Sequence, residues 1–183
     1  EKTAQEIYAQ IGGKSPIFDA TKVQAETLEK DLSYDGQNYK TFIAMRYWKP
    51  FAIDAAKKIA KYSPDQIIFL PLYPQFSSTT TESSLKAWEE VAGTPDKTVC
   101  CYPFEEGFLN AHVERIMDAY NAAGRPDNVA LLLSAHGLPE NVIEEGDPYQ
   151  WQIEEMAAKI SARLPDEWQK EFCYQSRVGP LKW

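Results

Sequence analysis

The sequence predicts an α/β protein built on doubly wound parallel sheets. Two observations support this fold class: short aliphatic runs recur along the chain, and stretches with helical spacing of apolar residues separate them. The runs that are typical of strands are 41–45, 66–70, 98–102, 129–133 and 171–174. Because strands that alternate with helices form parallel sheets covered on both faces, the chain is expected to hold two such layered units.

The helices are predicted from apolar stripes and from residues that begin or end helices. Pro50 suits a first helical turn, and the apolar stripe after it stops at Ser63 and Pro64. Between Leu109 and Tyr120, apolar residues recur at the spacing of one helix face. The predicted helices run over about 50–62, from about 82, over about 109–120 and over about 148–163. The region 103–107 is the predicted boundary between two α/β domains, 1–107 and 108–183.

Composition limits the classes of function. The 183 residues carry a net charge of −8 and 44% hydrophobic residues, which indicates a globular protein with a core. The chain lacks the dense Lys/Arg patches that nucleic-acid binding requires. No signal peptide or membrane-spanning run is visible, so a cytoplasmic protein is predicted, and peripheral contact with the inner membrane and the oligomeric state stay open.

The cysteines favour a reducing compartment. Cys100, Cys101 and Cys173 show no paired spacing, so neither a disulfide framework nor a zinc ribbon nor an iron–sulfur cluster is supported within this chain. The chain opens without methionine inside a helical pattern and stops at Trp183 with no closing element. These ends suggest a fragment.

Polar residues follow the predicted strands at the edge where parallel sheets bind ligands. Arg46 and Tyr47 follow the first run, His136 follows the fourth, and the segment 175–177 follows the fifth. His136 could be an ordinary histidine that bonds nearby backbone, but Gly137 and Pro139 suggest a backbone shaped to present its ring. A neutral imidazole can accept a proton near pH 7 and can bind ferrous iron, and the sequence leaves both roles open.

Six motifs in order resemble the ferrochelatase family, whose members insert ferrous iron into a porphyrin to make haem. They are IGGKSPI, MRYWKPF, LPLYPQFSSTTTESS, SAHGLP, GDPY and YQSRVGPLKW, and they cover about Tyr8 to Trp183. The RYW form is similar to the Gram-negative type, which implies protoporphyrin IX as the porphyrin. The resemblance implies a chelatase-like fold of two Rossmann-like or flavodoxin-like units with a cleft between them.

The resemblance also implies roles for individual residues. His136 matches the catalytic histidine on one side of the bound macrocycle, as proton acceptor or metal-site residue, and Arg46 and Tyr47 match residues on the opposite side that handle the metal. Ser15 matches a serine that meets a propionate. The remaining matches are pocket or site-edge residues: Tyr8, Gln175, Ser176, Arg177 and Trp183. No cofactor is implied, since Fe²⁺ is the substrate metal.

The chain departs from the family pattern in two respects. Glu82 stands where the family has a glycine after the threonines, and the first strand and the C-terminal acidic metal-site residue of the family are not present. The fragment could therefore lack activity. Two alternatives stay open: a chelatase for another tetrapyrrole or metal, and a non-catalytic haem- or porphyrin-binding module, although no Cys-x-x-Cys-His motif is present.

Overall fold

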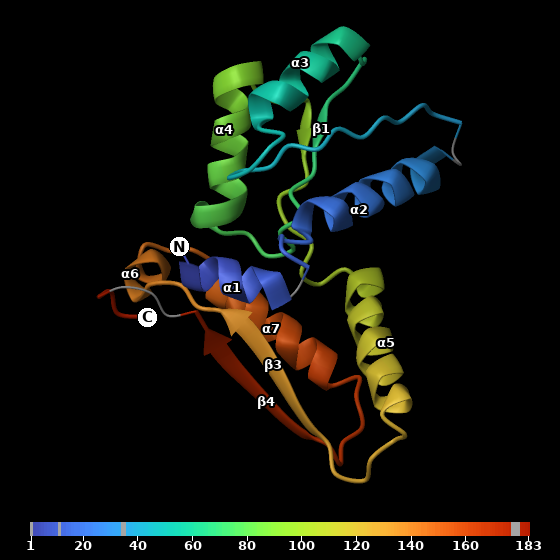
Figure 1. The fold of residues 1–183 in the computed structure, drawn as a ribbon, viewed down its shortest axis with the longest axis vertical. Helices are drawn as coiled ribbons and strands as arrows, with labels where there is room; N and C mark the ends of the chain where they lie inside the picture. The colour runs from blue at the N-terminus through green and yellow to red at the C-terminus, as the bar shows by residue number, and fades with distance from the viewer. Residues whose placement is uncertain (1, 11, 34–35, 177–179) are drawn as a thin grey trace. The chain divides into compact units, whose positions relative to one another are not determined.

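The chain divides into two compact units in a computed structural model that describes residues 2–10, 12–33, 36–176 and 180–183 (Figure 1). The first unit consists of Glu1–Asp65 and Ala87–Thr94, and the second of Gln66–Lys86 and Pro95–Trp183. These units do not share the boundary predicted at 103–107, which stays a prediction about domains. Each unit is described by itself below.

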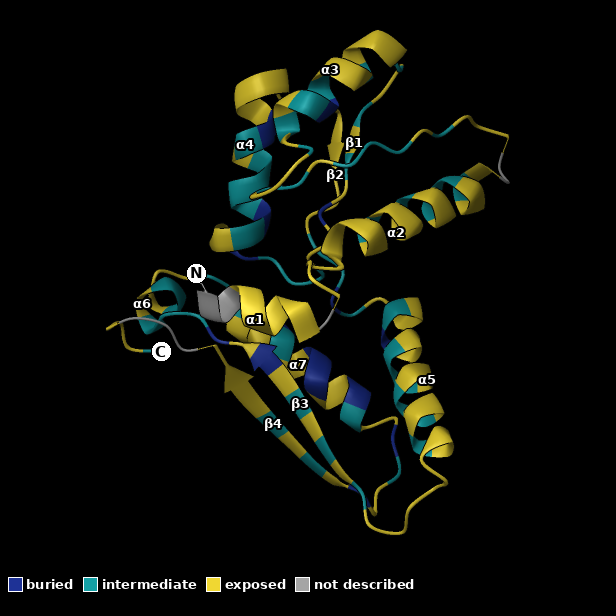
Figure 2. Ribbon diagram, in the orientation of Figure 1, coloured by how far each residue is buried: buried dark blue, intermediate teal, exposed yellow. Residues whose placement is uncertain are grey.

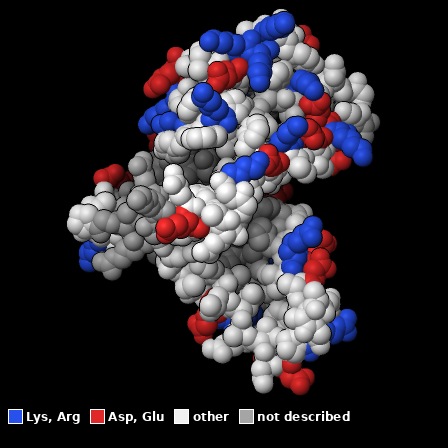
Figure 3. Space-filling model, in the orientation of Figure 1, with Lys and Arg blue, Asp and Glu red and all other residues white. Residues whose placement is uncertain are grey.

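The first unit is helical. It contains α1 (Lys2–Gln10), α2 (Ile17–Leu32), α3 (Ala52–Tyr62) and the C-terminal part of α4 (Ser83–Ala92). Ala55 and Trp88 are its buried apolar residues among those described. The helix predicted after Pro50 is confirmed as α3, whereas α2 was not anticipated. On the face of the molecule that Figure 3 shows, basic and acidic side chains lie interspersed.

The predicted strand at 41–45 is wrong for the described part of the chain, where this segment pairs with no strand. The segment is held instead by α2. The hydroxyl of Thr41 donates to the Ala25 carbonyl oxygen at 3.2 Å, and the backbone N–H of Thr41 donates to a carboxylate oxygen of Glu29 at 2.8 Å. A run of apolar residues indicates burial but does not identify a pairing partner. The spacing of apolar residues alone therefore cannot establish a strand.

Glu29 is expected to stabilise the first unit in a pH-dependent way. Its carboxylate accepts bonds from the Lys40 ammonium group at 2.8 Å and from Thr41, and these contacts lower its pKa to about 2. Because the folded-state pKa is depressed, the stabilisation is present above about pH 4.5 and is lost as the pH falls toward 2. We expect Glu29→Gln to lower the melting temperature by about 3–6 °C at pH 7.

Thermal unfolding at pH 7 and at pH 3 measures this effect, with Glu26→Gln as the control because Glu26 makes an exposed ion pair with Lys22 at 3.7 Å. The difference between Glu29→Gln and the unsubstituted chain should shrink at pH 3. A difference that is equal at both pH values would contradict the role of the Glu29 charge.

The second unit is α/β. Its elements are β1 (Ile68–Phe69), the π-helical turn η2 (Ser78–Glu82), the start of α4, β2 (Lys97–Thr98), α5 (Glu106–Ala122), β3 (Ala130–His136), α6 (Glu140–Glu144), α7 (Tyr149–Ser161) and β4 (Gln169–Gln175). Both strand pairs, β1 with β2 and β3 with β4, are parallel. Parallel pairing of strands that helices separate confirms the predicted α/β class. The helices predicted near 82, 109 and 148 appear as α4, α5 and α7.

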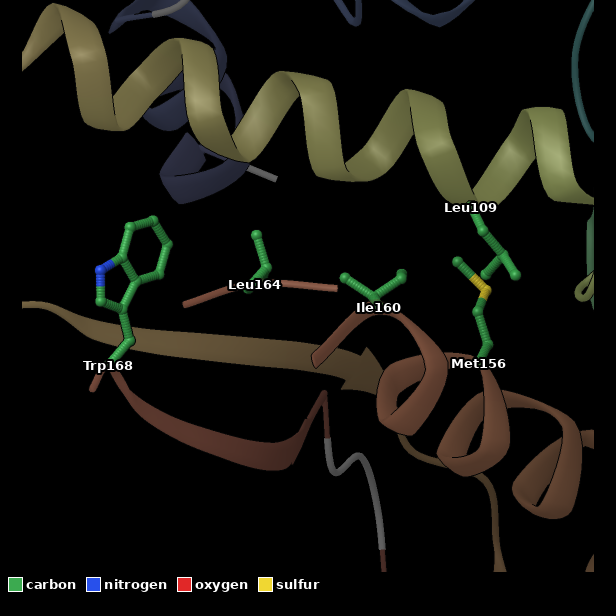
Figure 4. Packing of buried hydrophobic residues seen from close by; sticks show 5 residues of the cluster. All are labelled: Leu109, Met156, Ile160, Leu164 and Trp168. Carbon is green, nitrogen blue, oxygen red and sulfur yellow. The ribbon is translucent and has the colours of Figure 1, made fainter. Parts of the chain in front are cut away.

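The core of the second unit lies between α5, α7 and the β3–β4 sheet. Leu109 on α5 points toward Met156 and Ile160 on α7, and Trp168 closes the cluster beside Leu164 (Figure 4). Leu131 and Leu133 of β3 pack against this cluster. In Figure 2, α7 shows buried residues along one side.

The alternate residues of β3 and β4 lie on the other face of this sheet. Leu132, Ser134 and His136 are exposed there, opposite Glu171, Cys173 and Gln175 in the register of β4. Because side chains alternate along a strand, the packing of Leu131, Leu133 and Ala135 toward the core directs His136 to the exposed face. The exposed position of His136 therefore follows from which residues of β3 pack into the core.

Candidate active site

The carboxyl ends of β3 and β4 bring two of the predicted site residues together. His136 is the last residue of β3, and its register partner is Gln175, the last residue of β4. Both residues are exposed. Since paired residues of neighbouring parallel strands project to the same face, the His136 imidazole and the Gln175 amide share one surface at the sheet edge.

Gly137 allows the close approach that fixes this edge. Its N–H donates to the Gln175 carbonyl oxygen at 2.8 Å, which extends the ladder by one residue beyond His136. A Cβ atom at this buried glycine would lie 3.3 Å from the Gln175 carbonyl oxygen and 3.4 Å from the ring of Trp183. The glycine of the SAHGLP motif thus leaves room for backbone and indole to pack directly behind the histidine.

Lys182, the residue before Trp183, holds Trp183 beside Gly137. The carbonyl oxygen of Lys182 accepts from the Glu140 N–H at 2.9 Å, and the Lys182 ammonium group pairs with the Glu140 carboxylate at 2.9 Å. The indole Nε1 of Trp183 is buried and finds no hydrogen-bond partner among the described residues. An indole N–H is a donor only, so this atom is available to an acceptor on a ligand or to a water molecule.

A cavity of about 630 Å³ lies at these strand ends, between α6, the start of α7 and the end of β4. Aromatic rings form much of its wall, with carboxylates and amides interspersed. Its lining includes Tyr149, Tyr174, Gln175, Ser176 and Trp183. An aromatic wall with a few polar groups suits a flat apolar ligand that carries charged tails.

The two tyrosines of this cavity stay protonated at neutral pH. Burial raises the pKa of Tyr149, although a backbone hydrogen bond from His136 opposes the shift. Burial and a 2.8 Å hydrogen bond from the Tyr174 hydroxyl to the Glu154 carboxylate raise the pKa of Tyr174. The hydroxyls therefore serve as neutral hydrogen-bonding groups rather than as charges.

Four further predicted site residues belong to the first unit. Tyr8 is partly exposed on α1, and the Ser15 hydroxyl accepts from the Ile17 N–H at 3.3 Å before α2. The guanidinium group of Arg46 lies 4.7 Å from the centre of the Tyr47 ring, whose side chain is exposed. The predicted cleft between the two units remains a prediction.

Arg177, also a predicted substrate-binding residue, lies outside the described residues. Within the described ranges, no group of three or more His, Cys, Asp and Glu side chains is arranged to hold a metal ion. Among the helices described, none is long and apolar enough to cross a membrane.

A family model named Ferrochelatase matches residues 1–183. The chain belongs to the ferrochelatase family. It is 55% identical over 174 residues to a ferrochelatase of Hyphomonas neptunium, covering 94% of this chain and 49% of that protein. It is 51% identical over 187 residues to a ferrochelatase of Caulobacter vibrioides, covering 100% of this chain and 54% of that protein. The chain thus spans about half the length of these curated relatives.

Two tyrosines within the ferrochelatase motifs make contacts that were not predicted from the sequence. Tyr149 stands in the GDPY motif and lines the cavity from the start of α7. Tyr174 precedes Gln175 in β4, and its alternation toward α7 could have indicated its contact with Glu154. Neither tyrosine is among the site residues predicted from the sequence, because their places in the cavity depend on how α7 packs beside the end of β4.

Proposed function

We propose that this chain carries the histidine side of a ferrochelatase active site and that the protein inserts ferrous iron into protoporphyrin IX to form haem. The observation that carries the proposal is the exposed His136 at the end of β3, which precedes Gly137 and pairs with Gln175, both of which line a cavity of about 630 Å³ together with Tyr149, Tyr174 and Trp183. Membership of the ferrochelatase family supports the reaction, and 40–55% identity to ferrochelatases supports the substrates.

The chemistry requires a base and a way to strip water from iron. Two pyrrole N–H protons leave the porphyrin as Fe²⁺ enters, so a neutral imidazole at the mouth of the site can accept a proton or bind the arriving ion. Tyr149, Tyr174 and Trp183 supply aromatic surface for the macrocycle. The indole N–H of Trp183, which finds no partner among the described residues, can donate to an acceptor on the substrate.

The remaining assignments follow the family resemblance. Ser15 is proposed to meet a propionate, Tyr8 to form part of the pocket wall, and Arg46 with Tyr47 to position the metal. Gln175 and Ser176 line or adjoin the cavity, and Arg177 is proposed to act with them. Iron is a substrate in this proposal. That no further cofactor is needed and that the protein is cytoplasmic are predictions, and peripheral contact with the inner membrane stays open.

Two other functions make different predictions. A chelatase for another tetrapyrrole or metal would share the cavity and differ in substrate selectivity. A non-catalytic porphyrin-binding module would bind metallated porphyrin without converting the free base. The presence of an exposed histidine at the strand end, rather than a helix-borne haem ligand, favours catalysis.

Anaerobic visible spectroscopy tests the proposal. The chain is mixed with free-base protoporphyrin, and Fe²⁺ or Zn²⁺ is then added, with the Caulobacter vibrioides ferrochelatase as positive control. We expect the free-base bands to convert to the simpler metalloporphyrin spectrum faster than in a protein-free sample. Binding without conversion supports the porphyrin-binding alternative, and no binding while the control is active overturns the proposal for this chain.

Arg46 gives a separate prediction about metal use. Its guanidinium group stacks on Tyr47, and its replacement by alanine should raise the KM for the metal about tenfold, which is the loss of an interaction of about 1.4 kcal/mol. The melting temperature should change little. Arg115→Ala is the matched control, since Arg115 is an exposed arginine on α5 with a 3.8 Å ion pair. A collapsed thermal transition in Arg46→Ala would count against a role in metal handling.

A further inference from the structure

Glu154 on α7 joins two residues of the wall of the cavity at the strand ends. One of its carboxylate oxygens accepts from the Tyr174 hydroxyl of β4 at 2.8 Å and from the side-chain amide of Gln150 at 3.0 Å. Tyr174 and Gln150 both line the cavity of about 630 Å³. Glu154 therefore connects two parts of this wall, one on β4 and one on α7.

The spacing of residues on α7 and β4 explains this contact. Gln150 and Glu154 are four residues apart on α7, so they lie on one face of the helix. On β4, Tyr174 shares a face with Phe172, whose ring lies 4.9 Å from its own, and with Lys170. The Lys170 ammonium group donates to a carbonyl oxygen at the end of α7 at 3.2 Å. The face of β4 that carries Tyr174 therefore packs toward α7.

The bond to Glu154 decides which role the Tyr174 hydroxyl can take toward a ligand. A phenol has a single hydrogen, so once this hydrogen is donated to Glu154, the oxygen can only accept. Burial and the same hydrogen bond raise the pKa of Tyr174, so the hydroxyl keeps its hydrogen at neutral pH. Tyr174 thus offers lone pairs and no donor to a molecule in the cavity.

Two carboxylates of α6 add to the acceptor groups of this cavity. Glu140 and Glu144 both line it, and their spacing of four residues places them on one helix face. The Glu140 carboxylate pairs with the exposed Lys182 at 2.9 Å, whereas no ion pair of Glu144 is seen within the described ranges. Because a carboxylate accepts only, Glu140, Glu144 and the held Tyr174 hydroxyl are three groups that cannot donate to a ligand.

Donors line the same cavity from the end of β4 and from the C-terminal tryptophan. They are the Gln175 amide, the Ser176 hydroxyl and the indole N–H of Trp183, which has no partner among the described residues. A ligand carboxylate is stabilised where donors replace its water and is disfavoured where it meets only acceptors and like charge. The cavity is therefore suited to carboxylates at some of its polar groups and not at others.

We propose that Tyr174 is a specificity-determining residue of this cavity and that Glu154 is its positioning residue, which holds the hydroxyl as an acceptor. The inference rests on the proposed function, in which the cavity takes a porphyrin. Protoporphyrin IX carries two neighbouring propionates, which the donors can meet together. Coproporphyrin III carries one propionate on each pyrrole ring, so some of its carboxylates must approach the acceptor groups. The pair of Glu154 and Tyr174 thus selects against porphyrins with additional carboxylates.

Fluorescence titration tests the selection by comparing the Kd of protoporphyrin IX with that of coproporphyrin III. The unsubstituted chain should prefer protoporphyrin. In Glu154→Gln, the new amide can donate to the Tyr174 oxygen and free the hydroxyl hydrogen for a ligand carboxylate. We expect this variant to lower the preference about fivefold or more, and Tyr174→Phe, which removes an acceptor without adding a donor, to lower it less.

Two further readouts show whether Glu154 acts through Tyr174. The Cζ signal of Tyr174 in a chain labelled with ¹³C-tyrosine reports hydrogen bonding of the hydroxyl, and it should move in Glu154→Gln. In the Tyr174→Phe background, Glu154→Gln should change the preference by less than about twofold, because the contact it modifies is already lost. A full effect of Glu154→Gln in that background overturns the positioning role.

Matched controls separate the hydrogen bond from charge and from general damage. Glu155→Gln removes the same charge one residue along α7 from an exposed position, and Tyr120→Phe removes the hydroxyl of a ring that packs on Trp168. Both should keep the preference and the Tyr174 signal. Since Glu154 and Tyr174 are exposed, their variants should keep the thermal transition. An equal effect of Glu155→Gln and Glu154→Gln would contradict the inference.

The outcomes distinguish the failure of this inference from the failure of the proposed function. If the chain binds porphyrins without metallating them and Glu154→Gln lowers the preference, the specificity stands and the proposed reaction falls. If the chain metallates protoporphyrin but the preference stays within twofold in both Glu154→Gln and Tyr174→Phe, the specificity is overturned and the proposed function stands. Binding of neither porphyrin overturns both for this chain.

Discussion

Replacing His136 with alanine is expected to lower the rate of porphyrin metallation by about 10²-fold or more, the range typical of a positioned proton acceptor. The imidazole is exposed at the end of β3, so its removal leaves the apolar cluster of Leu109, Met156 and Ile160 intact. The aromatic wall of the cavity is also retained. Affinity for free-base protoporphyrin should therefore change by no more than about threefold, which corresponds to less than about 1 kcal/mol.

The measurement is the initial rate of metalloporphyrin formation, with porphyrin binding followed separately by fluorescence. His112→Gln is the matched control, because His112 lies on α5, bonds the Phe108 carbonyl oxygen at 2.9 Å and is not part of the cavity at the strand ends. Added imidazole should restore part of the activity of His136→Ala. Unchanged turnover in that variant would refute the role assigned to His136.

Replacing Leu109 with alanine is expected to destabilise the second unit by about 2–5 kcal/mol. Leu109 is 0% exposed and packs between α5 and α7, where Met156 and Ile160 contact it (Figure 4). Truncation removes buried methyl groups and leaves a cavity that these neighbours fill only in part. The expected loss is a large share of the stability of an ordinary domain, about 5–15 kcal/mol.

Urea unfolding monitored by tryptophan fluorescence measures this loss, because Trp168 belongs to the same cluster. Leu132→Ala is the matched control: it removes the same atoms from a leucine that is 66% exposed on the other face of β3. The control should change the free energy of unfolding by less than about 1 kcal/mol. Equal effects of the two substitutions would contradict the assigned core.

Four of the five runs predicted as strands overlap an observed strand, but the lengths of these strands were not predicted. The run at 129–133 became β3, which continues to His136, and the run at 66–70 kept only Ile68 and Phe69 in a ladder. Strand length depends on the partner: β3 pairs with β4 over seven residues, whereas β1 meets β2 over two. A ladder ends where its neighbour ends, and that neighbour lies far away in the sequence.

Asp147 illustrates what local sequence can and cannot predict. An aspartate just before a helix is typical of a capping residue, and the Asp147 carboxylate does accept from the Tyr149 N–H. The helix begins one residue later than predicted, at Tyr149. The bonds from Ser77 and Ser78 could not be predicted, because they join residues about seventy positions apart along the chain.

The sequence by itself determined the family, the alternation of helices with strands, and the histidine at the end of a strand. These features are local, since they depend on the order of residues within short motifs and on the spacing of apolar side chains. Only the tertiary structure decided that His136 faces away from the core beside Gln175, and that Tyr149 of α7 and Tyr174 of β4 line one cavity. Register and long-range hydrogen bonds set these contacts, and both depend on how α7 packs against the sheet.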